Sequence, residues 1–323
     1  MRPSLELDGD SLRANAAAFA ALGAPVAAVL KNDGYGWGAR RLVRELDRSV
    51  ESYLVADADE LAALRSATLK PIRLLADAPP GRLRAVLDLG GIPNVSTGAA
   101  LAEAVAEARR RNGLTVRVGI LDVAGWFSIR AADAPAFAAA CAGHGITVEL
   151  WTHFTSASHR KATLAALSAA RQTFAAAGVP VAGIDVASTA AARPELAFDR
   201  LRVGIGLFGA RLGTTPTVRN ALRVRAPVVR TLAAGELPRA GYGDLAIPPD
   251  RSAVLLRCGY GDGLPRKLAG IADILSVGMQ YTVRLTDEGR DACELIGARD
   301  DLDALAAYVG ISPHEFMVGF ASR

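Results

Sequence analysis

The chain has 323 residues, of which 51% are hydrophobic, and its formal net charge is only +4. This length and apolar content suit one large domain with a smaller one, and no apolar run reaches the length of a membrane-spanning helix. The basic runs at 109–111 and 223–225 are short and lack interleaved aromatic residues, and the opening residues hold no signal-peptide core, so we expect a cytoplasmic protein with neither a nucleic-acid nor a membrane partner.

A strand-then-helix unit recurs between residues 26 and 210. Each unit begins with a nearly continuous apolar run, which is typical of a strand buried on both faces of a parallel sheet. Eight such units predict a (β/α)8 TIM barrel, and an open doubly wound sheet is the alternative. No GxGxxG pattern follows the first strand, which argues against a dinucleotide-binding form of that alternative. The predicted strands are 26–31, 52–57, 71–77, 92–97, 115–122, 146–154, 183–188 and 201–210, and a predicted helix follows each of the first seven.

The pattern changes after residue 218, where apolar and polar residues alternate between Gly, Pro and Asp turns. This alternation predicts a smaller, mainly antiparallel β domain. A short helix is expected at 300–310, with aspartate at its start and glycine at its end. We therefore expect a barrel domain over 10–218 and a β-rich domain over 219–323, with the opening strand at 1–9 joining the second sheet.

Lys31 stands directly after the first predicted barrel strand and before a glycine-rich turn. The simplest interpretation is a strand-end lysine with its amine in solvent. In barrel enzymes, however, the carboxyl ends of the strands carry the chemistry. Asp77, Asp122, His153 and the pair 188–189 stand at the ends of other predicted strands in the same way. Their convergence favours an active site at that rim.

The segment AVLKNDGYGWG at 28–38 resembles the pyridoxal-phosphate lysine motif of the alanine racemase family. Other segments resemble motifs of that family in the same order along nearly the whole chain. The resemblance implies a fold-type III pyridoxal-phosphate enzyme, with a barrel followed by a β domain. The matching segments are WTHF (151–154), VASTAA (186–191), LRVGIGLFG (201–209), AGYGD (240–244), CGYGDGLPR (258–266) and, as closing strands, ELIG (294–297) and GFASR (319–323).

The resemblance also implies roles for the matching residues. Lys31 would form the Schiff base with pyridoxal phosphate and serve as one acid/base group, activated by burial beside Arg202. Tyr242 would come from the other subunit of a homodimer and act on the opposite face of the substrate. His153 would lie against the cofactor ring, and Arg202 would face its pyridine nitrogen. The residues implied in binding the phosphate end of the cofactor are Tyr35, Ser188, Thr189, Gly204 and Ile205, and those implied near the substrate are Trp126, Tyr260 and Met279.

The chain departs from the family pattern where the substrate carboxylate would be held. By alignment, Gly119 replaces a lysine and Trp126 replaces an arginine. Met279 is followed directly by glutamine, without the usual aspartate between them, and Trp37 replaces a histidine. Loss of a bidentate arginine–carboxylate contact disfavours a small free amino acid such as alanine. We therefore expect a roomier, more apolar substrate pocket lined by Trp126, although Trp37 and Trp126 could instead be packing residues.

These residues predict an amino-acid racemase or epimerase with a substrate other than plain alanine. Two alternatives stay open. One is a different pyridoxal-phosphate reaction, such as decarboxylation, elimination or aldol-type chemistry in specialised biosynthesis, and the other is a non-catalytic cofactor-binding protein. Individual residues also have simpler interpretations: His153 as a core histidine, Thr189 as a helix cap and Asp122 as a turn residue.

The cysteines and histidines show no metal-ligand spacing. Cys141, Cys258 and Cys293 lie far apart in apolar surroundings, without a CxxC pair. We therefore expect buried free thiols and no metal.

Overall fold

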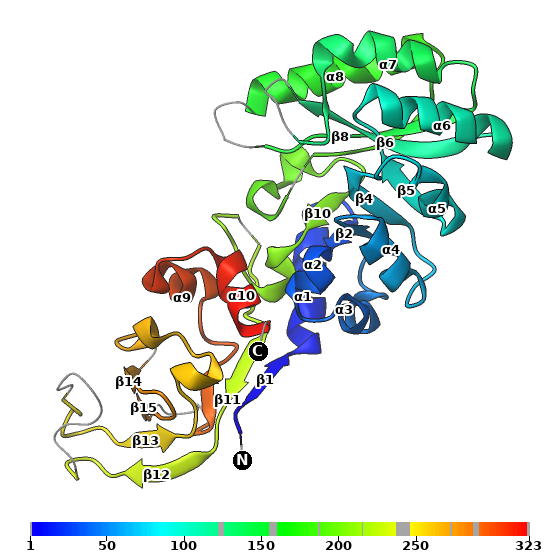
Figure 1. Cartoon of the computed structure of the whole chain (residues 1–323). Helices are drawn as coiled ribbons and strands as arrows, with labels where there is room; N and C mark the ends of the chain where they lie inside the picture. The colour runs from blue at the N-terminus through cyan, green and yellow to red at the C-terminus, as the bar shows by residue number, and fades with distance from the viewer. Residues whose placement is uncertain are drawn as a thin grey trace. The chain divides into compact units, whose positions relative to one another are not determined.

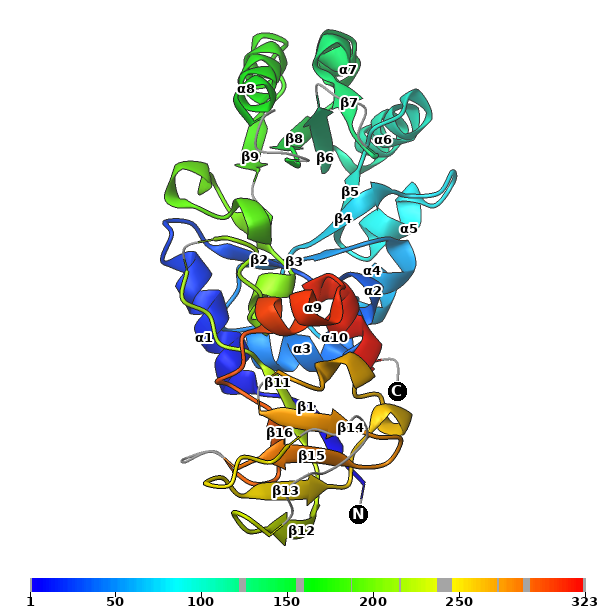
Figure 2. The same ribbon diagram turned by 90° about the vertical axis from the view of Figure 1, so that its left-hand side faces the viewer.

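The computed structural model describes residues 2–121, 126–154, 160–186, 188–214, 216–236, 246–271, 273–286 and 291–321. The chain divides into two compact units, whose ribbons are drawn in Figures 1 and 2. The barrel unit comprises residues 16–204 and 213–216, and the β unit comprises residues 1–15, 205–212 and 217–323. The domain boundary at residue 218 stays a prediction.

The barrel unit contains the eight predicted parallel strands. In the described residues they pair in the order β10-β2-β3-β4-β5-β6-β8-β9, and a parallel bridge between Asp185 and Arg200 joins the two ends of this path. The barrel is thus nearly closed, and the predicted fold is confirmed. The strands are β2 (Val26–Val29), β3 (Ser52–Val55), β4 (Ile72–Asp77), β5 (Gly91–Asn94), β6 (Leu114–Leu121), β8 (Ile146–Trp151), β9 (Val181–Asp185) and β10 (Leu201–Val203), and the short β7 (Ile129–Arg130) pairs with β6.

Helices cover the outer side of the barrel strands. Figures 1 and 2 both show α6, α7 and α8 outside β6 and β8. Side-chain caps fix two helix starts, because the Asp57 carboxylate accepts the Asp59 and Glu60 N–H groups and the Thr97 hydroxyl accepts the Ala100 N–H. The helices are α3 (Ala39–Leu46), α4 (Ala58–Arg65), α5 (Leu83–Asp88), α6 (Gly98–Arg111), α7 (Ala134–Cys141) and α8 (Arg160–Ala176), and the segment labelled α2 (Lys31–Tyr35) has a left-handed backbone over residues 32–35.

The helix predicted after the seventh barrel strand is wrong. The chain forms two short 3-10 turns there, η2 (Thr189–Ala191) and η3 (Pro194–Leu196). Pro194 has no N–H to donate and disfavours helical backbone at the residue before it. Arg193 is accordingly extended, with φ −159° and ψ 159°, and this separates the turns.

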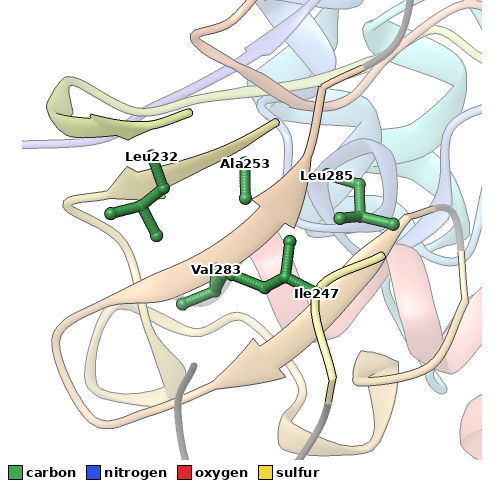
Figure 3. Close-up of a cluster of buried hydrophobic side chains, with 5 residues drawn as sticks. All are labelled: Leu232, Ile247, Ala253, Val283 and Leu285. Carbon is green, nitrogen blue, oxygen red and sulfur yellow. The ribbon is translucent and has the colours of Figure 1, made fainter. Parts of the chain in front are cut away.

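The β unit contains two antiparallel sheets in the described part of the chain. One has the order β1-β11-β16, so the opening strand joins the C-terminal sheet as predicted, and the other has the order β12-β13-β15-β14. An apolar cluster packs on the second sheet, and Figure 3 shows Leu232, Ala253, Val283 and Leu285 with Ile247. The strands are β1 (Ser4–Leu7), β11 (Leu222–Arg225), β12 (Val228–Leu232), β13 (Ala253–Leu256), β14 (Ile274–Val277), β15 (Thr282–Leu285) and β16 (Glu294–Ile296).

The last segment of the β unit is helical. The helix predicted at 300–310 is confirmed as α9 (Leu302–Val309), with Asp301 at its N-cap and Gly310 at its C-cap. Of the segment 319–323, expected as a closing strand, residues 319–321 form the end of α10 (Pro313–Ala321), and residues 322–323 lie outside the described residues. A Ser312–Glu315 capping pair starts α10, and it buries Phe316, Met317 and Phe320, a spacing of helical rather than strand period. The remaining elements are the helix α1 (Gly9–Ala20) and the short turns η1 (Ala131–Asp133), η4 (Ile205–Phe208), η5 (Tyr260–Asp262) and η6 (Arg266–Leu268).

The structure also bears on the cysteines and on membrane and metal sites. Cys141 and Cys258 are buried free thiols, as predicted, whereas Cys293 is free but only half-buried. Among the described residues, no helix combines the length and apolarity that crossing a membrane requires. The same residues contain no cluster of three or more His, Cys, Asp or Glu side chains suited to a metal ion.

Candidate active site

Lys31 follows β2 at the carboxyl end of the barrel. Leu30, immediately before it, is fully buried, and its N–H donates to the Leu54 carbonyl of β3 at 2.8 Å. The Lys31 side chain is exposed, so the expectation that it is buried is wrong. The reason is that β2 ends at Val29 and the backbone turns at Lys31, so the side chain is no longer covered by the packed strands.

The turn after Lys31 has an unusual left-handed backbone. Residues 32–35 have φ angles of 53°, 49°, 65° and 60°, a conformation that costs about 1–2 kcal/mol for each non-glycine residue. Two carboxylates hold this turn: Asp33 accepts the N–H of Ala39 at the start of α3 at 2.7 Å, and Glu60 accepts the N–H of Asp33 at 3.3 Å. A glycine suits position 34, because a Cβ there would lie 3.2 Å from the backbone of Ala39 and would push the end of the Leu42 side chain aside. The chain thus fixes the backbone beside Lys31 against its own conformational preference.

Tyr35, Thr189 and Gly204 come together next to this turn. A Cβ on Gly204 would lie 2.1 Å from the Tyr35 hydroxyl, so only glycine allows the phenol to approach this closely. The Gly204 N–H donates to the Thr189 hydroxyl at 3.3 Å. Ser188 precedes Thr189 and is half-buried, and the buried Ile205 follows Gly204 in the chain. Phosphate oxygens accept hydrogen bonds from hydroxyl and backbone N–H groups, and such groups gather here.

Arg202 lies on β10 with its guanidinium group buried. Its Nε lies 2.7 Å from the Asp185 carboxylate, and its Nη2 donates to the Thr152 carbonyl. Its guanidinium carbon lies 5.2 Å from the centre of the Trp151 ring. Desolvation lowers the pKa of Arg202 to about 10, with Asp185 opposing this effect and Arg117 adding to it. The group therefore keeps its positive charge at neutral pH.

His153 follows β8 at the same end of the barrel. Its side chain is still exposed at the rim, but the surrounding protein removes much of the hydration of the ring. This desolvation, together with the positive charges of Arg202 and Lys31, lowers the pKa of His153 to about 4. The imidazole is therefore neutral at pH 7.

The comparison with protein families shows to which family the chain belongs. Residues 7–212 match the model for the N-terminal domain of alanine racemase. The chain belongs to the alanine racemase family. The alanine racemase of Acidiphilium cryptum is 30% identical, and the alignment covers 99% of the chain and 97% of that relative. That of Desulfovibrio desulfuricans is also 30% identical, over 79% of the chain and 73% of the relative.

Solved alanine racemases share the fold of this family member. The Acinetobacter baumannii enzyme superimposes with a TM-score of 0.79 at 18% identity, over 100% of this chain and 98% of that one. The Bartonella henselae enzyme, with covalently bound pyridoxal phosphate, has a TM-score of 0.74 at 20% identity, over 99% and 97% of the two chains. The barrel followed by a β-rich region is therefore the architecture of alanine racemases, and the family resemblance seen in the sequence is confirmed.

The barrel interior beside Gly119 is filled by Trp151. A Cβ on Gly119 would lie 2.6 Å from Cζ2 of Trp151 and 2.8 Å from Cβ of Ser128. The indole of Trp151 therefore occupies the space into which the lysine implied by the family pattern would project.

Trp126, where the family pattern implies an arginine, is 87% exposed, and the neighbouring Phe127 is 45% exposed. Phe127 has a left-handed φ of 58°, and its carbonyl accepts a hydrogen bond from Nδ2 of Asn94 at 2.8 Å. The role of Trp126 as a pocket residue stays a prediction.

The other predicted site residues belong to the β unit or are not described. Tyr242 and Asp122 lie outside the described residues. Tyr260 and Met279 lie together in the β unit, because the Tyr260 N–H donates to the Gly278 carbonyl at 2.9 Å and the Gly261 N–H donates to the Met279 carbonyl at 2.9 Å. Both side chains are partly exposed, Tyr260 by 38% and Met279 by 60%.

Sequence reasoning missed several side chains that support the site. Asp185 and Thr152 hold Arg202, Asn94 and Trp151 occupy the interior beside Gly119, and Glu60 holds the turn after Lys31. A signal existed for Asp185, which is a charged residue within an apolar strand run. Trp151 itself reads as an ordinary apolar strand residue, and the indirect signal for it was the glycine at position 119 within the neighbouring strand.

Proposed function

We propose that this chain is a pyridoxal-phosphate-dependent racemase or epimerase acting on an amino-acid-like substrate. The observation that carries the proposal is the exposed Lys31 amine at the carboxyl end of β2, next to the left-handed turn that brings Tyr35 beside Thr189 and Gly204. Membership in the alanine racemase family and the covalently bound cofactor of the Bartonella henselae enzyme support it.

The residues present fit the proposed cofactor. Its aldehyde requires a primary amine, which Lys31 offers from an exposed position. Its phosphate requires donors, and the hydroxyls of Tyr35 and Thr189 lie together beside Gly204. The buried hydroxyl of Thr152 has no hydrogen-bond partner among the described residues, so a further polar group remains available beside His153.

The chemistry then depends on proton transfer by two groups of the protein. When bound, pyridoxal phosphate withdraws electrons from the α-carbon of an amino acid linked to it and makes the α-proton acidic. Lys31 would remove or return that proton at its Nζ on one face of the substrate, and Tyr242 would do so at its hydroxyl on the other. Arg202 contributes a fixed positive charge and has no proton to give up, which would keep the pyridine nitrogen unprotonated and discourage transamination.

Two further parts of the proposal rest on the family resemblance. Tyr242 would come from the second subunit of a homodimer, so that each active site is completed by both chains. The cofactor would belong to a domain over residues 10–218, in a cytoplasmic enzyme. These statements are tested by the oligomeric state of the enzyme and by complementation between Lys31→Ala and Tyr242→Phe subunits.

We further propose that the substrate is not plain alanine. Trp151 fills the space beside Gly119, and Trp126 offers an exposed indole instead of a guanidinium group. An indole cannot pair with a carboxylate as arginine does, but it can contact an apolar substituent. The same two departures favour a second candidate, a decarboxylase, lyase or aldol-type enzyme that uses the same cofactor, because such an enzyme need not hold the carboxylate in the same way.

The test is α-proton exchange in D2O, followed by NMR, with a panel of L- and D-amino acids. A racemase exchanges the proton of both enantiomers without changing the mass of the product beyond deuterium, and Lys31→Ala abolishes the exchange. Lys161→Ala, an exposed lysine on α8, serves as the matched control and should match the wild type.

A product of changed composition in mass spectrometry would establish the second candidate instead. Background exchange with every amino acid, despite a visible cofactor band, would show a non-catalytic binding protein. Borohydride reduction and peptide mapping must find the pyridoxyl label on Lys31; a label on another lysine, or no label, refutes the proposal.

A further inference from the structure

Trp151 lies between two buried arginines and a buried amide. Its indole Nε1 donates to Oδ1 of Asn94 at 2.7 Å, and both residues are buried. The guanidinium carbons of Arg117 and Arg202 lie 5.4 Å and 5.2 Å from the ring centre. At these distances the negative face of an aromatic ring attracts a guanidinium cation, most strongly where water is excluded.

The position of the indole is fixed by what surrounds it. Gly119 on β6 provides the space, because a Cβ there would lie within 2.6 Å of the ring. Asn94 cannot rotate freely, since its Nδ2 donates both to the Asp77 carboxylate at 2.7 Å and to the Phe127 carbonyl at 2.8 Å. Asp77 is in turn held by the backbone N–H and the hydroxyl of Ser96, each at 3.0 Å. The Trp151 ring is therefore held in one position beside Arg202.

The orientation of the Arg202 guanidinium plane depends on the Trp151 ring, because the other contacts of Arg202 do not fix it fully. Its Nη2 donates to the Thr152 carbonyl, and its Nε lies 2.7 Å from the Asp185 carboxylate but makes no hydrogen bond within the described residues, so these two contacts do not fix the guanidinium plane. A flat guanidinium group donates well only when its plane is fixed. The Trp151 ring can supply that orientation through cation–π attraction.

We propose that Trp151 is a positioning residue that orients Arg202 toward the pyridine nitrogen of the cofactor, with Asn94 holding the indole in place. This inference rests on the proposed function. It gives the Gly119–Trp151 pair a role in place of the lysine that the family pattern implies, and through Asn94 it links Arg202 to the Trp126–Phe127 turn.

The first experiment measures cofactor binding in variants of Trp151. Trp151→Leu removes the aromatic face, Trp151→Phe keeps one, and Phe174→Leu removes a fully buried aromatic side chain from α8 as the matched control. Pyridoxal phosphate is titrated by absorbance, and the pH midpoint of its visible band is then measured. We expect Trp151→Leu to raise Kd about tenfold and to shift the midpoint. Trp151→Phe should lie between it and the wild type, and Phe174→Leu should change only the unfolding temperature.

The second experiment needs no cofactor. Gly119→Ala should lower the unfolding temperature in the wild type, because its methyl group meets both the indole and Cβ of Ser128, and should lower it less in the Trp151→Leu background, where the Ser128 contact alone remains. Equal losses in the two backgrounds would overturn the inference.

An unchanged Kd and an unchanged pH midpoint for Trp151→Leu would also overturn the inference, provided that the wild type binds the cofactor. If the wild type binds no pyridoxal phosphate, the proposed function fails first and this inference fails with it. The two failures are therefore distinguishable.

Discussion

Replacement of Asp185 by asparagine tests the ionic framework beneath the candidate site. The Asp185 carboxylate is fully buried and lies 3.0 Å from Nη2 of Arg117, 2.7 Å from Nε of Arg202 and 3.5 Å from Nη1 of Arg200. Desolvation alone would raise the pKa of Asp185, but the positive charges of Arg117, Arg202 and Arg200 outweigh it and hold the pKa below its ordinary value. The carboxylate is therefore charged at neutral pH and balances several cations.

The expected loss of stability follows from the few contacts that Arg117 would keep in Asp185→Asn. In Asp185→Asn this fully buried guanidinium group retains the Leu74 carbonyl at 3.1 Å and the Glu149 carboxylate at 3.9 Å. Removing one partner of a buried ion pair typically costs about 3–5 kcal/mol, since the other charge is left uncompensated. Asparagine keeps an acceptor oxygen, so we expect about 3 kcal/mol, a large part of the stability of an ordinary domain.

The assay is urea denaturation followed by far-UV circular dichroism. Asp133→Asn is the matched control, because Asp133 pairs with Arg130 at the surface, where an ion pair contributes little. Since the pKa of Asp185 is lowered in the folded state, its contribution is present above the unfolded pKa of about 3.9 and is lost as the pH falls through the folded value. The difference in the free energy of unfolding between wild type and Asp185→Asn should therefore become smaller at acid pH. Equal stabilities of Asp185→Asn and Asp133→Asn at pH 7 would refute the reasoning.

Two further predictions concern titrating side chains. Burial raises the pKa of Cys141 to about 11 and that of Cys258 to about 12, so in the native protein a thiol reagent should label the half-buried Cys293 first; equal labelling of all three before unfolding would contradict this. Because the pKa of His153 is lowered to about 4 from an ordinary 6.5, the wild type should lose unfolding free energy relative to His153→Gln as the pH falls from about 6.5 to about 4. An NMR titration that places the midpoint of the His153 ring near 6.5 would contradict the second prediction.

The barrel could be predicted from the sequence because its signals are local. Each strand is a short apolar run and each crossover a helical one, so periodicity alone indicates their order. The prediction failed where local and tertiary signals differ. Residues 189–196 are rich in alanine, yet Pro194 divides them into two turns, and residues 319–323 matched a strand motif although Ser312 and Glu315 start a helix before them.

The candidate site was only partly predictable. Lys31, His153 and Arg202 could be located because strand ends meet at one rim of a barrel. The exposure of Lys31 could not, because four successive left-handed residues are rare and depend on carboxylates, such as Glu60, that are distant in sequence. The role of Trp151 was equally hidden, although glycine inside a strand often marks a close approach by another group, and Gly119 was such a sign.

The buried charged residues inside the barrel link the stability effect expected for Asp185 to the orientation of Arg202. Barrel interiors are usually filled by branched apolar side chains, but here Arg73 and Arg117 on two strands are buried against Glu149 and Asp185. A buried ion pair adds little net stability over apolar packing, so its main effect is to fix the orientation of its members. Asp185 extends this network to Arg202 at the carboxyl end. We infer that the network orients the cation of the site, and that Asp185→Asn should weaken pyridoxal phosphate binding as well as stability, whereas Asp133→Asn should leave both unchanged.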